Sequence, residues 1–172
     1  MFSKTLIAAL LASTAVATPI ASCTGERTYQ LRTFGTGAGS IFQGKAIIEC
    51  DGYLCVNVTM YTADCPTKFT FDKGYVNLPE EQQLYIEDYG VKYAPSADAN
   101  STANGWTFIA PGSSKDTTLG SLTFEGYDFH TCMGPDPQIY TITAFPAGQE
   151  ATGKCYEQIQ LIGQEVTASE DS

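Results

Sequence analysis

Short apolar runs with a period of two residues constrain the fold of this chain most strongly. In one of them Val56, Val58 and Met60 alternate with more polar neighbours, which is the pattern of a strand with one buried face. Gly, Pro, Asn and Asp interrupt such runs about every 8 to 12 residues, as in β-sandwiches and barrels. The expected strands are 28–34, 41–50, 53–62, 68–71, 75–78, 84–87, 106–109, 119–124, 139–145 and 156–162. We therefore expect an all-β fold, a single-domain β-sandwich or barrel-like sheet structure with disulfides.

The composition supports one compact domain. The 172 residues are 43% hydrophobic and 16% charged, which is enough apolar material for one core. The interval 93–105 is rich in small polar residues and is expected to be a surface loop. Residues 18–172 are expected to form one secreted β-rich domain that ends in a polar tail.

The first 17 residues have the pattern of a secretory signal peptide. Lys4 precedes an apolar stretch, and Ala15 and Ala17 supply the small residues that a signal peptidase requires. A bacterial lipoprotein signal ending at Cys23 is the less favoured alternative, because it would leave five other cysteines, an odd number. We expect a secreted, extracellular protein.

Six cysteines in a secreted chain predict disulfides. They are Cys23, Cys50, Cys55, Cys65, Cys132 and Cys155. An even number without a C-x-x-C spacing, and with one histidine in the chain, argues for pairing rather than for zinc. Cys132 with Cys155 is the favoured bridge. Cys50 and Cys55 flank Asp51-Gly52, a type I′ hairpin signal, and that pair could bond or could face Cys65.

The net charge of −10 limits the partners. An acidic chain repels phosphate backbones and anionic membrane surfaces. We expect neither nucleic acid nor membrane as a partner, and the sequence does not indicate the oligomeric state.

A search for catalytic residues gives weak candidates. Asp128 and His130 would share one strand face about 7 Å apart, too far for a direct hydrogen bond. Glycosidase carboxylates normally lie on different strands, and Glu49 with Glu125 is one conceivable pair. No complete metal or cofactor motif accompanies these residues, so we expect no enzyme activity, no metal and no cofactor.

Tyrosines and the one tryptophan are better candidates for binding. Tyr85, Tyr89, Tyr93 and Trp106 lie among polar residues in one third of the chain. Exposed aromatic rings of this kind could stack on sugar rings, although ordinary packing of a β-sheet is the alternative. Asn57 and Asn100 begin Asn-X-Thr sequons and are candidate N-glycosylation sites.

Several segments together resemble a known family. They are YQLRTF (29–34), FTFDKGYVNL (69–78), QQLYIED (82–88), NGWT (104–107), GSLTF (120–124), and Cys132 followed by QIY (138–140) and Cys155. In order and spacing this resembles the phialide cell-wall proteins of filamentous fungi, the PhiA-like family. The four early cysteines exceed the family's usual pair, so the chain resembles a diverged member. The resemblance implies a secreted, β-rich, wall-associated protein without catalytic residues.

These observations lead to a hypothesis about function. We expect a secreted, non-enzymatic, fungal cell-wall-associated protein with a structural or glycan-contacting role, whose partner is wall polysaccharide or an extracellular protein. The alternative is a secreted effector that acts on a host or competitor protein. A glycoside-active enzyme that uses two acids is less favoured.

Overall fold

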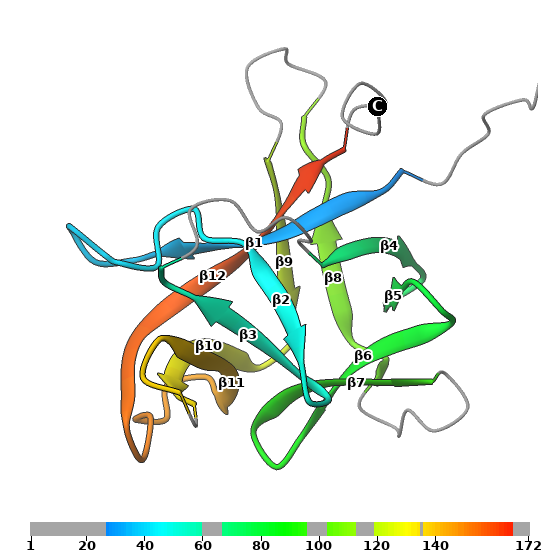
Figure 1. The fold of residues 1–172 in the computed structure, drawn as a ribbon. Coiled ribbons are helices and arrows are strands. Elements are labelled where there is room, and N and C mark those ends of the chain that lie inside the picture. Colours follow the sequence, from blue (N-terminus) through cyan, green and yellow to red (C-terminus); the bar gives the residue numbers. More distant parts are fainter. Residues whose placement is uncertain (1–26, 60–66, 96–102, 113–118, 135, 167–172) are drawn as a thin grey trace, which may run out of the picture.

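The twelve elements named among the described residues of the computed structural model are all β-strands (Figure 1). The structure describes residues 27–59, 67–95, 103–112, 119–134 and 136–166. The strands are β1 (Tyr29–Gly35), β2 (Ile47–Cys50), β3 (Tyr53–Asn57), β4 (Lys68–Asp72), β5 (Tyr75–Leu78), β6 (Gln82–Glu87), β7 (Gly90–Pro95), β8 (Trp106–Ile109), β9 (Leu119–Phe124), β10 (Tyr127–Met133), β11 (Ile139–Pro146) and β12 (Cys155–Glu165). All pair antiparallel in one sheet, so the predicted all-β fold is confirmed.

The twelve strands of the described residues form three successive units of four. In each unit the two middle strands make a hairpin, namely β2–β3, β6–β7 and β10–β11. The outer strands form a ring in the order β1, β4, β5, β8, β9, β12, and β12 pairs with β1 again. The turn before β5 joins the start of β8, because the carbonyl of Gly74 accepts hydrogen bonds of 3.2 Å from the N–H groups of Gly105 and Trp106. This is the topology of a β-trefoil, the barrel-like one of the two expected architectures.

The three hairpins pack together on one side of the ring, in the lower half of Figure 1. Tyr53 of β3 pairs with Lys92 of β7, and Gly90 of β7 pairs with Thr143 of β11. β11 pairs in turn with β3 along three residues. Each hairpin therefore contacts the other two, and the cluster forms a layer beneath the ring.

The core follows from the alternation along the strands. In β1 the side chains of Tyr29, Leu31 and Thr33 are buried, whereas Gln30 and Arg32 are less so. Inward-facing residues of every unit join one apolar cluster, and they include Leu31, Ile47, Leu54, Phe69, Val76, Leu84, Trp106, Leu122, Phe129, Ile142 and Leu161. One shared core thus holds the three units together.

The turn predicted between β2 and β3 is confirmed. Asp51 and Gly52 have φ angles of 47° and 82°, which are the two positive values of a type I′ turn. Cys50 pairs directly with Tyr53, and Cys50 and Cys55 form a disulfide across the hairpin. Of the two alternatives left open for Cys50 and Cys55, the bond between the two cysteines is the one observed.

Two strands and several boundaries differ from the prediction. The strand expected over 53–62 ends at Asn57, so Val58 lies beyond it and Met60 lies outside the described residues. β7 occupies residues partly assigned to a loop, and β10 is a full strand. Residues 41–44 are a turn rather than the start of a strand, because Gly44, with a φ of 67°, reverses the chain. The expected signal peptide lies outside the described residues. Among the described residues, no helix has the length and apolar character needed to cross a membrane.

Candidate functional site

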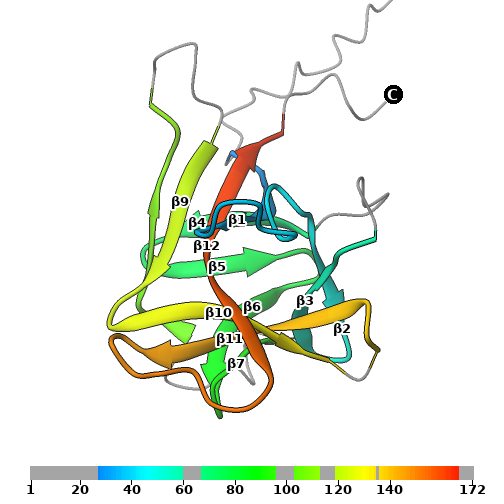
Figure 2. The ribbon, with the colours of Figure 1, turned by 90° about the vertical axis from the view of Figure 1, so that its left-hand side faces the viewer.

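A hollow of about 480 Å³ lies where β10, β12 and the loop between β11 and β12 meet. Its lining comes from Asp128 and His130 on β10, the loop residues Gly148, Gln149, Glu150 and Ala151, and Cys155, Tyr156, Glu157 and Gln158 on β12. The hollow is the candidate binding site, and Figure 2 shows the β10–β11 hairpin and β12 that frame it.

The loop on one side of the hollow is held in place by hydrogen bonds to the preceding turn. The N–H of Ala147 donates to the carbonyl of Gly126 at 2.8 Å, and the N–H of Gly148 donates to Oδ2 of Asp128 at 3.3 Å. Gly148 has a φ of 78°, a conformation that favours glycine. Asp128 therefore fixes the loop with one carboxylate oxygen and keeps further acceptor capacity.

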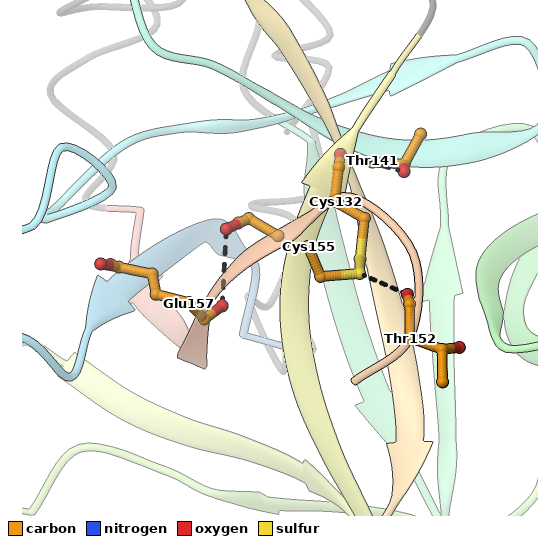
Figure 3. The surroundings of a disulfide bond; sticks show 6 residues. Cys132, Thr141, Thr152, Cys155 and Glu157 are labelled. Carbon is orange, nitrogen blue, oxygen red and sulfur yellow. Dashed lines mark hydrogen bonds between the residues drawn. A yellow bond between two sulfur atoms is a disulfide. The ribbon is translucent and has the colours of Figure 1, made fainter. Parts of the chain in front are cut away.

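The predicted disulfide between Cys132 and Cys155 is observed beside the hollow. It joins β10 to the first residue of β12, and the Sγ of Cys155 contacts the carbonyl of Thr152 at 3.2 Å (Figure 3). The bridge closes the loop between β11 and β12 at its base. In Figure 3 the side chain of Glu157 points away from the sulfur atoms.

An irregularity in the β10–β12 pairing exposes Tyr156. Thr131 pairs with Glu157 whereas Cys132 pairs with Cys155, so Tyr156 is the extra residue of a β-bulge. Bulges redirect side chains, and 52% of Tyr156 is exposed. Tyr156 is not among the residues that the sequence singles out for binding, because no sequence pattern marks this bulge.

Tyr156 is supported from below by aromatic contacts. Its ring packs edge-on against Tyr140 with centroids 5.0 Å apart, and Tyr140 packs in the same way against the buried Phe42. Burial raises the pKa of the Tyr140 hydroxyl, and the neighbouring Tyr156 raises it further. The exposed ring is thus anchored to the core.

The loop between β1 and β2 borders the same part of β12. The Ser40 hydroxyl donates a hydrogen bond to the Glu157 carboxylate, and the Thr36 hydroxyl donates to the carbonyl of Gln158 at 2.8 Å. Gly35 is required here, since a Cβ at that position would collide with Ser40 and Glu157. Glu157 keeps a second oxygen for other contacts.

Asp128 and His130 lie in the hollow together, as the prediction of a shared strand face requires. The His130 ring packs edge-on against Phe145 with centroids 5.5 Å apart. Burial lowers the pKa of His130, and the Asp128 carboxylate opposes this shift. Burial in the hollow therefore favours the neutral form of the His130 imidazole.

None of the four aromatic residues that were predicted to stack on glycans is a lining residue of the hollow. For Trp106 the structure corrects the prediction, because its side chain is buried. It is 2% exposed, stacks on Phe129 with planes 4° apart, and donates from Nε1 to the carbonyl of Leu84. Both faces of its ring are thus committed to the core. Trp106 is the first residue of β8, and the alternation along this strand directs its side chain into the core.

The three predicted tyrosines lie on the β6–β7 hairpin or its turn. The Tyr93 hydroxyl accepts a hydrogen bond from the N–H of Gly52, and Tyr85 is half-buried opposite Lys92. Tyr89 is 47% exposed, but one face of its ring stacks on Phe145. None of these tyrosines is a lining residue of the hollow.

Of the remaining predicted sites, only some lie among the residues that the structure describes. Asn57 is half-buried, and its Oδ1 accepts hydrogen bonds from the N–H and the hydroxyl of Thr59. Asn100, Cys23 and Cys65 lie outside the described residues.

Glu49, one of the two acids named as a conceivable catalytic pair, has another acid as an electrostatic neighbour. Burial raises the pKa of Glu49, and the charge of Glu80 raises it further. Among the described residues, no group of three or more His, Cys, Asp or Glu side chains is placed to hold a metal ion.

Comparison of the chain with protein-family models, with curated proteins and with solved structures finds no match.

Proposed function

We propose that this protein is a secreted, non-enzymatic, wall-associated protein of a fungus that contacts polysaccharide through the hollow. The observation that carries the proposal is the exposed Tyr156, which is anchored on Tyr140 and is a lining residue of the hollow together with the polar residues Gln149, Glu150 and Gln158. A sugar ring presents an apolar face and a rim of hydroxyl groups. An anchored aromatic ring with neighbouring acceptors matches both features.

Other features support the extracellular part of the proposal. Disulfides persist in oxidising compartments, and two are observed. The sequence of residues 1–17 has the pattern of a signal peptide. The resemblance to phialide cell-wall proteins supports a place in the wall.

The contacts of the polar groups favour binding over catalysis. Asp128 holds the loop through Gly148, Glu157 accepts from Ser40, and His130 packs against Phe145. Groups that support the hollow in this way are suited to hold a ligand in a fixed frame. These residues can therefore take part in ligand recognition without changing the contacts that they make in the structure.

The test is retention on insoluble chitin, β-glucan and mannan. We expect the protein to be retained by at least one of them and Tyr156→Ala to reduce the retained fraction. Tyr89→Ala is the matched control, because Tyr89 has a similar exposure and lies outside the hollow lining. Circular dichroism checks that both variants are folded.

Each contrary result has a distinct meaning. Retention by none of the three polymers would remove the wall-binding function. Equal loss in both tyrosine variants would remove the hollow as its site. Capture of an extracellular protein without retention by polysaccharide would favour an effector.

A further inference from the structure

Asn57 is the last residue of β3 and begins the sequon Asn57-Val58-Thr59. Its Oδ1 accepts a hydrogen bond of 3.0 Å from the N–H of Thr59 and one of 2.8 Å from the Thr59 hydroxyl. A backbone N–H can only donate, so the oxygen of the Asn57 amide, and not its nitrogen, must face Thr59. The nitrogen Nδ2 therefore lies on the other side of the amide, away from the turn.

The nitrogen of this amide is accessible and takes no part in the fold. Within the described part of the chain, Nδ2 of Asn57 has no hydrogen-bond partner. The buried side-chain N and O atoms without a partner among the described residues are Nε of Arg32 and Oγ1 of Thr67. Nδ2 of Asn57 is not one of them, so solvent reaches it. A group attached to Nδ2 would replace no contact of the protein.

The strand register places Asn57 on the outer face of the sheet. Tyr140 of β11 pairs with Val56, and the preceding Ile139 pairs with Asn57. Neighbouring residues of a strand point to opposite faces, and Val56 is fully buried in the core. Asn57 therefore faces outward. Tyr156 packs on Tyr140, so it lies on the opposite side of the sheet from Asn57.

We infer that Asn57 carries an N-linked glycan and that this glycan leaves Tyr156 uncovered. The inference goes beyond the proposed binding function and requires only its secretory part. Thr59 supplies the hydroxyl that the sequon needs at its third position. The outward Nδ2 allows the folded chain to keep the modification.

The modification is a group transfer from a lipid diphosphate oligosaccharide, the sugar donor of the eukaryotic secretory pathway. Nδ2 of Asn57 attacks C1 of the first sugar and forms the N–C bond. The bond between C1 and the diphosphate oxygen breaks, and its electron pair leaves with the lipid diphosphate. Nδ2 loses one proton to a base of the transferase.

Asn77 is an internal control in the same chain. It is half-buried like Asn57, but its Oδ1 accepts a hydrogen bond of 2.9 Å from Nε2 of Gln83 on the neighbouring strand. Pro79 stands where a sequon requires a hydroxyl. Asn77 should therefore stay unmodified under the conditions that modify Asn57.

The test is secretion of the full chain from a fungal host, with Asn100→Gln as the background so that one sequon remains. We expect the protein to lose mass on treatment with peptide-N-glycosidase. That enzyme converts a modified asparagine to aspartate, so peptide mapping should find the conversion at Asn57 and not at Asn77. Thr59→Val keeps the shape of the side chain without its hydroxyl and should abolish the mass loss. Thr59→Ser keeps the hydroxyl and should retain it.

Several results would overturn the inference. They are a secreted protein with Asn57 unmodified, a chain that the host does not secrete, and a mass loss that persists in Thr59→Val. The first and the third leave the polysaccharide site standing, because that site is measured separately by retention on wall polymers.

Retention on those polymers tests the position of the glycan. We expect Asn57→Gln to be retained to the same extent as its parent, because the glycan and Tyr156 lie on opposite sides of the sheet. A lower or higher retention of the variant, with unchanged circular dichroism, would overturn this placement. Retention of neither protein, with Asn57 glycosylated, would remove the proposed function and leave the modification site standing.

Discussion

The second and third units of the fold have the same order of strands but use their aromatic residues in different ways. Trp106 begins β8, the last strand of the second unit, and is 2% exposed; Tyr156 lies at the start of β12, the last strand of the third, and is 52% exposed. Trp106 continues the regular alternation and enters the core. Tyr156 is the extra residue of a bulge and leaves it.

The difference shows how a site arises on a repeated scaffold. The third unit adds a disulfide, a bulge and a loop fixed by Asp128 to the common topology. These local features leave a hollow beside an anchored ring. A fold alone does not specify a function, and here the difference between the units lies in those few residues.

The largest expected effect is that of Trp106→Ala on stability. The substitution removes a fully packed ring and its hydrogen bond to Leu84, and we expect the free energy of unfolding to fall by about 3–5 kcal/mol. Denaturant unfolding followed by circular dichroism measures it, because Trp106 is the one tryptophan of the chain.

Trp106→Phe provides the control for this experiment. It keeps an aromatic ring in the core and should lose less stability. A Trp106→Ala variant of unchanged stability that no longer binds polysaccharide would reverse the contrast between the two units.

Removal of the two disulfides should have unequal effects. Cys132→Ala with Cys155→Ala opens a bridge between residues 23 apart, and Cys50→Ala with Cys55→Ala one between residues 5 apart. The loop-closure model gives losses of about 3 and about 2 kcal/mol. Thermal unfolding compares the two pairs of substitutions.

The same variants also separate the regions by function. We expect the first pair alone to reduce retention by polysaccharide, because that bridge fixes the base of the loop beside the hollow. Equal retention by both variants would show that the hollow does not depend on the bridge.

Much of the fold can be predicted from local sequence patterns. The alternation along the chain predicts the all-β class, and Asp51-Gly52 predicts a type I′ turn that is observed. The pairing of Cys132 with Cys155 is also correct. Each of these features depends on neighbouring residues or on one short loop.

Features that depend on distant contacts were not predictable. The threefold order of the units does not show as an internal repeat, because the inward positions of the second strand of each unit hold different residues, such as Ile47, Leu84 and Phe129. The bulge at Tyr156 arises from the β10–β12 register, which joins strands that are not consecutive along the chain. Trp106 is close in sequence to Tyr85, Tyr89 and Tyr93 but is buried on β8, whereas the tyrosines lie on the β6–β7 hairpin. This separation also depends on distant contacts.

A smaller effect is expected for Tyr89→Ala. This side chain stacks on Phe145 with centroids 5.3 Å apart and remains 47% exposed. We expect a loss of roughly 1 kcal/mol from the aromatic pair and no change in retention by polysaccharide. Urea unfolding measures the first quantity, and a loss of retention would extend the binding surface to the β6–β7 hairpin.

The smallest expected effect is the contribution of His130 to the pH dependence of stability. Because burial lowers the pKa of His130 in the folded state, the unfolded chain binds the proton more tightly, and stability falls as the pH drops below about 6.5. His130→Gln should remove this part of the loss, so its free energy of unfolding should change less between about pH 7 and pH 5. Asp128→Asn should have the opposite effect, because the Asp128 carboxylate favours the charged imidazole and its removal lowers the pKa further. Urea unfolding at both pH values measures these slopes, and a wild-type slope equal to that of His130→Gln would show that the hollow does not desolvate the imidazole.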